Sequence, residues 1–428
     1  MKVVLFEDEA TYNFDPLTLT RGAFDLRLGV FSFSDRARRV LRASKDSVHY
    51  LARDYIAAHI RARDGKTANQ PDKIDEEALF VNGLLLLDSG LAKLISKAKP
   101  GAVGVCKDRV AFAKFGQAPS VEVARLLMNA PGNEAVDSIL SMSLEKISVD
   151  SNALITNYWE IIGRNAHQIA SDLGGLKGRR PRSGVKVLGK ASSVTVGSEC
   201  EIGPNVVLDA GQGPIYIGDK TVVHPFTSIQ GPAYVGPNTI IQPNSVIREG
   251  SNIGEVCRIG GEVEETVFQA YSNKPHAGFA GHMYVGEWVN LGALFTNSDL
   301  KNTYGTISVM VKGKKVDSGT TKLGGMVGDH SKASIGSLLY TGKRVGVSSQ
   351  IHGAVEEDVP SFLFYGKTVG YPNWEIMPDP AIRTAKRVMA RRGVEMTSAD
   401  EKLLKQVFDM TQPERDSLNP GKGPFQFS

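Results

Sequence analysis

Between Ile217 and Ile259 an aliphatic residue returns at every sixth position without a break. This period fits neither an α-helix nor a simple β-strand, but it matches one flat side of a β-helix followed by a corner. The aliphatic side chain points inward, and glycine, proline or asparagine carries the turn. Three sides close one coil, so residues about eighteen positions apart should stack into an apolar column. The series consists of Ile217, Val223, Ile229, Val235, Ile241, Ile247, Ile253 and Ile259.

The same spacing begins at Val196 and reaches Ile351, with two further lapses. It fails over residues 260–284 and again over 296–322, where polar residues and glycines gather. We therefore expect a parallel β-helix over residues 187–371 that carries two loops. Loops on a rigid solenoid are where functional side chains are usually placed.

Strands and helices alternate in residues 1–175, which favours an α/β domain with a mostly parallel sheet. In such sheets ligands bind at the carboxyl ends of the strands. The expected strands are Lys2–Phe6, Ala78–Leu87 and Ala102–Cys106, and the expected helices are Ser34–Leu41, Val121–Met128 and Tyr158–Leu173.

Two other segments have distinct compositions. Residues 176–186 are basic and rich in glycine, which indicates a linker or, alternatively, a contact for a ligand phosphate. Residues 372–428 should form a helical tail with one helix near 381–392 and a second over 398–410. The first helix presents either a solvated basic face or an arm near a polyphosphate ligand. Its basic residues are Arg383, Lys386, Arg387, Arg391 and Arg392.

Composition restricts the partners and the compartment. Lys and Arg number 50 against 46 Asp and Glu, and a formal charge of +4 over 428 residues does not favour nucleic acid or a membrane surface. The acids Glu7 and Asp8 follow a short apolar start, which predicts a first strand and not a signal peptide. Three cysteines without metal-site spacing suit a reducing compartment, so we expect a cytoplasmic protein that binds small molecules.

The densest group of chemically useful side chains lies in residues 274–305. Imidazole can accept a proton near neutral pH, and an amine or hydroxyl nucleophile must lose a proton as it attacks a thioester. Asn, Lys and Tyr side chains nearby would hold a phosphorylated sugar. The candidate bases are His276 and His282, and the candidate binding residues are Lys274, Tyr284, Asn290, Asn297, Lys301 and Tyr304.

Residues 281–305 resemble the acetyltransferase segment of the bifunctional UDP-N-acetylglucosamine pyrophosphorylase/glucosamine-1-phosphate N-acetyltransferase family. The resemblance implies a homotrimer of left-handed β-helices with acetyl-CoA bound along the coils between subunits. It also implies that His282 is the general base, with His276 as the alternative, and that Lys274 replaces a missing phosphate-binding lysine. The implied substrate residues are Tyr284, Asn290, Asn297 and, approximately, Lys301.

The N-terminal half resembles a divergent branch of the same family. The resemblance is carried by Pro16–Arg21, Leu26–Gly29, Val81–Gly83 and Tyr158–Ile162, and in the tail by Ala390–Gly393. Nucleotidyltransferases of this fold have a glycine-rich loop after the first strand that cradles the triphosphate.

This chain departs from that pattern. Residues 6–14 contain three acids and no glycine, and Asn82 stands in place of the aspartate that binds Mg²⁺. Arg21 and Arg27 could neutralise phosphates. Asp15 or Asp88 could reach a metal ion. Uridylyl transfer with Mg²⁺ and a degenerate nucleotide-binding domain both stay open.

The sequence thus predicts an acetyl-CoA-dependent N-acetyltransferase that acts on an amino-sugar 1-phosphate, with glucosamine 1-phosphate as the best candidate. Uridylyl transfer would extend the product to UDP-N-acetylglucosamine. One alternative is a zinc enzyme that resembles the γ-class carbonic anhydrases, and another is a trimeric sugar-nucleotide-binding protein without catalysis. The histidines that could serve the zinc alternative are His224, His276, His282, His330 and His352.

Overall fold

The computed structural model describes residues 1–128, 133–174, 176, 178–181 and 185–423. The chain divides into two compact units, whose bounds differ from the expected ones at 175 and 371. The first comprises Met1–Arg27, Phe31–Glu160 and Thr397–Leu403, and the second Leu28–Val30, Ile161–Met396 and Leu404–Ser428.

The first unit is a nucleotidyltransferase-like α/β fold built on a six-stranded sheet of order β4-β1-β5-β7-β6-β8. β7 runs antiparallel to both of its neighbours, and the other pairs are parallel, so the expected mostly parallel sheet is confirmed. The strands are β1 (Lys2–Phe6), β4 (Val48–Leu51), β5 (Ala78–Asn82), β6 (Ala102–Cys106), β7 (Arg109–Phe115) and β8 (Glu145–Ser148).

Helices of this unit bury apolar side chains against the sheet, where Phe6, Phe80 and Val123 belong to one core cluster. The helices expected near residues 34 and 121 are confirmed as α1 and α4, the second starting earlier than expected. The bounds are α1 (Phe33–Val40), α2 (Asp54–Asp64), α3 (Ser89–Lys97), α4 (Gln117–Met128) and α5 (Asn133–Ser141).

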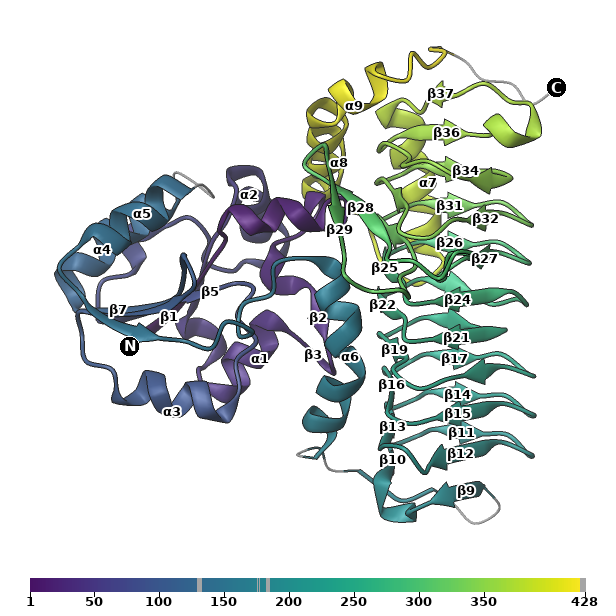
Figure 1. Ribbon diagram of the computed structural model, residues 1–428, viewed down its shortest axis with the longest axis horizontal. Helices are drawn as coiled ribbons and strands as arrows, with labels where there is room; N and C mark the ends of the chain where they lie inside the picture. Colours follow the sequence, from purple (N-terminus) through teal and green to yellow (C-terminus); the bar gives the residue numbers. More distant parts are fainter. Residues whose placement is uncertain (129–132, 175, 177, 182–184, 424–428) are drawn as a thin grey trace. The chain divides into compact units, whose positions relative to one another are not determined.

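The second unit is dominated by a left-handed β-helix of hexapeptide repeats, whose coils appear as successive rungs in Figure 1. Ile217 pairs in register with Val235, and Val235 with Ile253, as the eighteen-residue coil requires. The repeating aliphatic residues are buried in one continuous core. The predicted β-helix is therefore confirmed.

Three faces of parallel strands form the prism. The first face contains β10 (Val194–Val196), β13 (Ile215–Ile217), β16 (Ala233–Val235), β19 (Asn252–Ile253), β22 (Val267–Ala270), β25 (Tyr284–Glu287), β30 (Met326–Val327) and β33 (Arg344–Val345). The second contains β11 (Glu201–Ile202), β14 (Val222–Val223), β17 (Ile240–Ile241), β20 (Arg258–Ile259), β23 (Asn273–Lys274), β26 (Asn290–Leu291), β31 (Lys332–Ala333), β34 (Gln350–Ile351) and β36 (Leu363–Tyr365), and it ends with β37 (Trp374–Glu375), which runs antiparallel to β36. The third contains β9 (Lys186–Gly189), β12 (Val207–Ala210), β15 (Ser228–Gln230), β18 (Val246–Ile247), β21 (Glu262–Glu264) and β24 (Phe279–Gly281), continued by β27 (Thr296–Asn297), β32 (Leu338–Leu339) and β35 (Ala354–Val355).

The prediction of a loop over residues 260–284 is wrong, because the coils of the β-helix continue through these residues. Ile253 pairs with Phe268 and Ile259 with Lys274, so this coil is three residues shorter than its predecessors. The shortening breaks the six-residue period without breaking the strand ladder. A lysine at an inward position further hid the pattern.

The second lapse is a real excursion that leaves the coil after β27. It contains the antiparallel hairpin of β28 (Ser308–Val311) and β29 (Lys314–Asp317). Its ends are joined, because the Leu323 N–H donates to the Asp299 carbonyl over 2.8 Å.

Helices cover parts of the second unit. Asn165 of α6 (Tyr158–Leu173) donates to the Gly250 carbonyl over 2.7 Å and accepts from Asn252 of β19 over 2.9 Å, which fixes this helix against the first face. The two tail helices are confirmed as α7 (Pro378–Ala390) and α8 (Ser398–Met410), followed by α9 (Gln412–Asp416). In the expected linker, Arg179 pairs with Val196, whereas residues 177 and 182–184 lie outside the described part.

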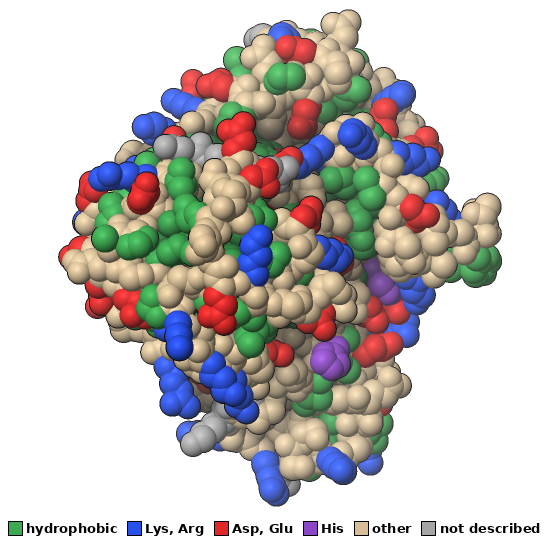
Figure 2. Space-filling view, turned by 60° about the vertical axis from the view of Figure 1, so that its left-hand side comes forward, with side chains coloured by type: hydrophobic (Ala, Val, Ile, Leu, Met, Phe, Trp, Pro, Cys, Tyr) green, Lys and Arg blue, Asp and Glu red, His purple; other side chains and the backbone are tan. Residues whose placement is uncertain are grey.

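None of the described helices combines the length and the apolar character that a membrane crossing requires. Acidic and basic side chains are interspersed over the face drawn in Figure 2, in keeping with the small net charge.

Candidate active site

His282 lies at the corner between the third and the first face, between β24 and β25, with a positive φ of 53°. Its Nδ1 lies 2.8 Å from Asp299 Oδ2, and its Nε2 lies 3.5 Å from Glu265 Oε2. The side chain is only 6% exposed. Shielding from water strengthens both electrostatic contacts.

The three residues occupy equivalent corner positions in consecutive coils, which places their side chains side by side. Glu265 and His282 both have positive φ, and Asp299 opens the excursion above them. Sequence reasoning missed Glu265 and Asp299, although each lies seventeen residues from His282, which is the strand-to-strand spacing of the coils at this corner. That spacing was the signal that could have found them.

The pKa values of the two carboxyl groups, Asp299 and Glu265, are shifted in opposite directions. Burial opposes ionisation of Asp299, but its hydrogen bond to His282 and the charges of His282 and Lys322 outweigh burial and lower its pKa. Burial raises the pKa of Glu265, and the neighbouring His282 opposes this only in part. An ionised Asp299 favours the tautomer with the proton on Nδ1, which leaves Nε2 to accept a proton.

A second layer of charges holds this corner. Glu264 accepts from Arg248 over 2.8 Å and from Lys322 over 3.2 Å. The Gly324 N–H donates to the His282 carbonyl over 3.0 Å. Both ends of the excursion therefore contact the His282 corner, Asp299 at its beginning and Lys322 at its end.

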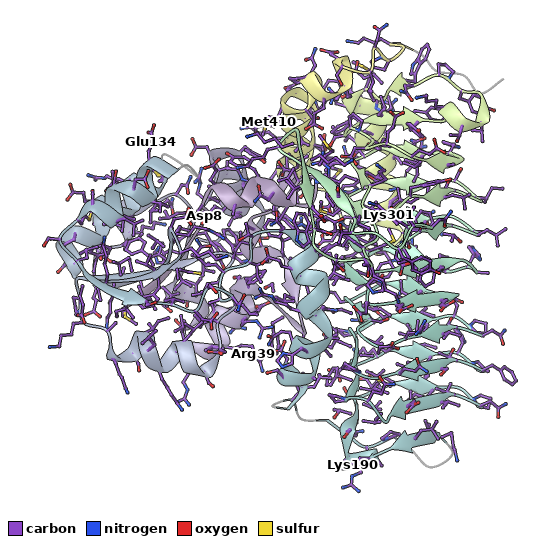
Figure 3. All side chains as sticks on the ribbon, viewed as in Figure 1. Asp8, Arg39, Glu134, Lys190, Lys301 and Met410 are labelled. Carbon is purple, nitrogen blue, oxygen red and sulfur yellow. The ribbon has the colours of Figure 1, made fainter. Side chains whose placement is uncertain are left out.

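His276, the alternative base, lies at a different corner, between the second and the third face. Its side chain is exposed and has no hydrogen-bond partner within the described part of the chain. Lys301 and Tyr304 lie in the excursion, where Lys301 Nζ donates to the Thr306 carbonyl and Tyr304 is 73% exposed. Figure 3 labels Lys301 beside the coils.

Lys274 and Asn297 point into the prism and do not reach a surface site. Lys274 is 1% exposed, and its Nζ donates to the carbonyls of Gly260, Gly278 and His276. Asn297 is 2% exposed and bonds both backbone groups of Gly281. Their expected contact with substrate does not fit this geometry, because their polar groups hold the backbone of the shortened coil.

Tyr284 and Asn290 lie on other faces than His282. Tyr284 is fully buried on the first face, where its hydroxyl donates to Gln269 Oε1 over 2.6 Å. Asn290 lies on the second face and accepts weakly from Asn273 over 3.5 Å. Within one chain the expected substrate residues therefore do not converge on the imidazole.

In the first unit, the first two acids that follow β1 are each paired with an arginine. Glu7 is paired with buried Arg53 at 3.0 Å, and Asp8 is paired with Arg109 at 2.8 Å. Asp8 also caps the short helix Glu9–Phe14 by accepting from the Ala10 N–H. Because they are paired with arginines, these two acids do not repel phosphate as free charges would. However, the Ala10 N–H at the start of this helix already donates to Asp8 and is not free to bind a phosphate.

The expected nucleotide residues are placed as follows. Asn82 is 2% exposed, donates to Asp8 Oδ2 over 2.8 Å and accepts from the Leu84 N–H over 2.9 Å. Arg21 is buried close to Asp25, whose pKa burial raises to about 7 despite the opposing charges of Lys66 and Arg21. Arg27 is half-buried in β2 (Arg27–Leu28).

This donor set does not fit a Mg²⁺ ion at Asn82. Its amide is engaged on both sides, and the neighbouring Asp8 carboxylate already bears the Arg109 guanidinium on both oxygens. Across the described residues, no group of three or more His, Cys, Asp or Glu side chains is placed to hold a metal ion.

Comparisons with known proteins agree with both folds. Residues 3–180 match the family model of sugar nucleotidyl transferases, and residues 214–249 match the model of six bacterial transferase hexapeptide repeats. A curated relative, a bifunctional sugar-1-phosphate nucleotidylyltransferase/acetyltransferase from Sulfurisphaera tokodaii, is 35% identical over 95 residues. That match covers 22% of this chain and 24% of the relative.

Solved structures with a similar solenoid include two UDP-N-acetylglucosamine acyltransferases. The one from Francisella novicida is 16% identical, with a TM-score of 0.29, over 57% of this chain and 92% of its own. The one from Arabidopsis is 11% identical, with a TM-score of 0.26, over 57% of this chain and 99% of its own. These two resemblances are too weak to carry an argument.

Proposed function

We propose that the chain transfers an acetyl group from acetyl-CoA to the amine of an amino-sugar 1-phosphate, with glucosamine 1-phosphate as the first substrate to test. The observation that carries the proposal is the His282 imidazole held by Asp299 on a corner of a hexapeptide β-helix. The activities named for the Sulfurisphaera relative, sugar-1-phosphate nucleotidylyl transfer and acetyl transfer, support the same reaction class.

The proposed step is direct acyl transfer. The amine nitrogen attacks the thioester carbonyl, its proton passes to His282 Nε2, and the carbon–sulfur bond breaks to release coenzyme A as a thiol after it takes up that proton. Asp299 stabilises the imidazolium formed in between. Because Glu265 lies 3.5 Å from Nε2, the amine must take the position of the Glu265 carboxylate or approach beside it.

We further propose that the chain works as a homotrimer. Three large apolar side chains lie exposed at the corner between the second and third faces, and exposed apolar surface commonly marks association sites. Phe226 and Leu294 are each 61% exposed, and Ile335 is 79% exposed. Association would bring faces of neighbouring chains together, so that residues on different faces could serve one site. Light scattering after size exclusion tests this proposal, and a monomer at micromolar concentration would contradict it.

For the first unit, a second candidate function is binding of a sugar nucleotide without nucleotidyl transfer. The observation that favours it is Asp8, which caps the helix after β1 and is bound by Arg109 and Asn82. A triphosphate would have to displace these contacts. The assay is pyrophosphate release from UTP with an N-acetylated sugar 1-phosphate, and steady release would contradict this second candidate.

The acetyl-transfer proposal is tested by thiol release from acetyl-CoA in the presence of glucosamine 1-phosphate. We expect His282→Ala to lower the rate by about 10²–10⁴-fold, the usual contribution of a general base. His276→Ala serves as the matched control, because it removes an exposed imidazole from another corner. Loss of activity in His276→Ala with full activity in His282→Ala would overturn the assignment of the base.

A further inference from the structure

Polar side chains on consecutive strands form a ladder along the second face of the β-helix. Strand pairing places Arg258 beside Asn273, Asn273 beside Asn290, and Asn290 beside Lys332. Neighbouring strands are about 4.8 Å apart, so the stretch from Arg258 to Asn290 spans about 10 Å. All four side chains are half-buried.

Arg392 joins this ladder from the end of α7. Its guanidinium donates to Asn273 Oδ1 over 2.8 Å, while its buried Nε has no hydrogen-bond partner among the described residues. Within the part of the chain that the structure describes, Arg258 donates only to the backbone carbonyls of Asn238 and Cys257, over 3.0 and 2.9 Å. Two guanidinium groups therefore flank Asn273 from separate parts of the chain.

The cations in this group repel one another, and each disfavours the charged form of its neighbour. Burial and then the charge of Arg392 lower the pKa of Arg258, and burial and then the charge of Arg391 lower the pKa of Arg392. Among the described residues, only the Cys257 thiol acts on these two groups in the opposite direction. Burial also lowers the pKa of Lys332 to about 7. Half-buried arginines that repel one another cost free energy unless an anion lies between them.

We propose that Arg258, Arg392 and Asn273 form a binding site for a phosphoryl anion, of which a diphosphate group is the best fit. Two planar guanidinium groups offer paired N–H donors that match phosphate oxygens. The helix C-terminus alone explains basic residues at the end of α7. It does not explain Arg258, which belongs to a strand.

The diphosphate could come from a free anion or from a nucleotide-containing cosubstrate such as coenzyme A. The inference goes beyond the proposed acetyl transfer, because binding can be measured without turnover. It also gives the basic helix predicted from the sequence a specific role at its last turn.

The test is calorimetric titration of the full-length protein with inorganic pyrophosphate at constant ionic strength. We expect Arg258→Gln and Arg392→Gln each to weaken the Kd by about tenfold or more, the effect of losing one charge-assisted contact. Arg392→Lys keeps the positive charge but loses the paired N–H donors of the guanidinium group, so it should weaken pyrophosphate binding less. Arg383→Gln, an exposed arginine on the same helix, should bind as the wild type does.

Melting temperatures of the variants identify any variant that fails to fold. If a glutamine variant does not fold, the pyrophosphate affinity of Arg392→Lys is compared with that of the wild type instead. Coenzyme A as a competitor separates the two sources: displacement of pyrophosphate supports a cosubstrate, and its absence supports a free anion. The proposal is overturned if pyrophosphate does not bind the wild type, or if all variants bind it equally.

Discussion

Replacing Lys274 by methionine should destabilise the β-helix although it removes a buried charge. Burial lowers the pKa of this ammonium from its ordinary value of 10.5 to about 8, which corresponds to about 3 kcal/mol spent on keeping the charge. Hydrogen bonds to a charged group contribute about 1.5–3 kcal/mol each, and Lys274 donates three. The balance predicts a loss of about 3 kcal/mol, or about 6–12 °C in Tm.

Differential scanning calorimetry of the full chain measures this effect. Lys190→Met is the control, since Lys190 is exposed on the first coil, where Figure 3 labels it, and should change Tm little. The lowered pKa adds a second signature. Between pH 8 and 10.5 the unfolded chain binds the proton that the folded chain has lost, so wild-type stability should rise with pH, and the methionine variant should lack this rise. A Tm of Lys274→Met equal to the wild type would refute the reasoning.

Three further predictions concern both units. Asn82→Asp places a second carboxylate beside Asp8 and should lower the free energy of unfolding by about 2 kcal/mol without creating Mg²⁺-dependent pyrophosphate release, as a urea titration and a release assay would check; an equally stable variant would contradict this. Burial opposes ionisation of Asp400, but hydrogen bonds from His59 and Thr397 outweigh burial and lower its pKa, so the stability that Asp400 contributes should hold above pH 4 and fade below it. Asp400→Asn should lower the free energy of unfolding by about 2 kcal/mol at neutral pH. A variant as acid-sensitive as the wild type would count against this role of the His59–Asp400 pair. Gly278→Ala places a Cβ against the Phe295 carbonyl at a φ of 121° and should lower the free energy of unfolding by about 3 kcal/mol, measured as a fall in Tm. An unchanged Tm would show that the backbone at this corner shifts to make room for the Cβ.

The fold could be predicted from the sequence wherever the six-residue period holds. Ile217 and Ile253 lie in the core because glycine and proline fix the corners between them. The period could not describe residues 260–284, since the coil there loses three residues and Lys274 takes an aliphatic position. Only the strand register shows that the ladder continues.

The candidate site could be predicted only in part. His282 stands out as an imidazole in a glycine-rich stretch, but its partners Glu265 and Asp299 depend on which residues stack in neighbouring coils. The same stacking turns Asn297 inward and places Tyr284 on another face. Residue type indicated chemistry at these positions, but the direction of each side chain in its coil could not be derived from the sequence.

The most direct test of the central claim, that His282 and Asp299 act as one proton-accepting unit, is a double-mutant cycle on thiol release from acetyl-CoA. Asp299→Asn should lower kcat by about 10²-fold or more in the wild-type background. In the His282→Gln background it should change little, because the imidazole that it serves is absent. Equal losses in both backgrounds would contradict the account.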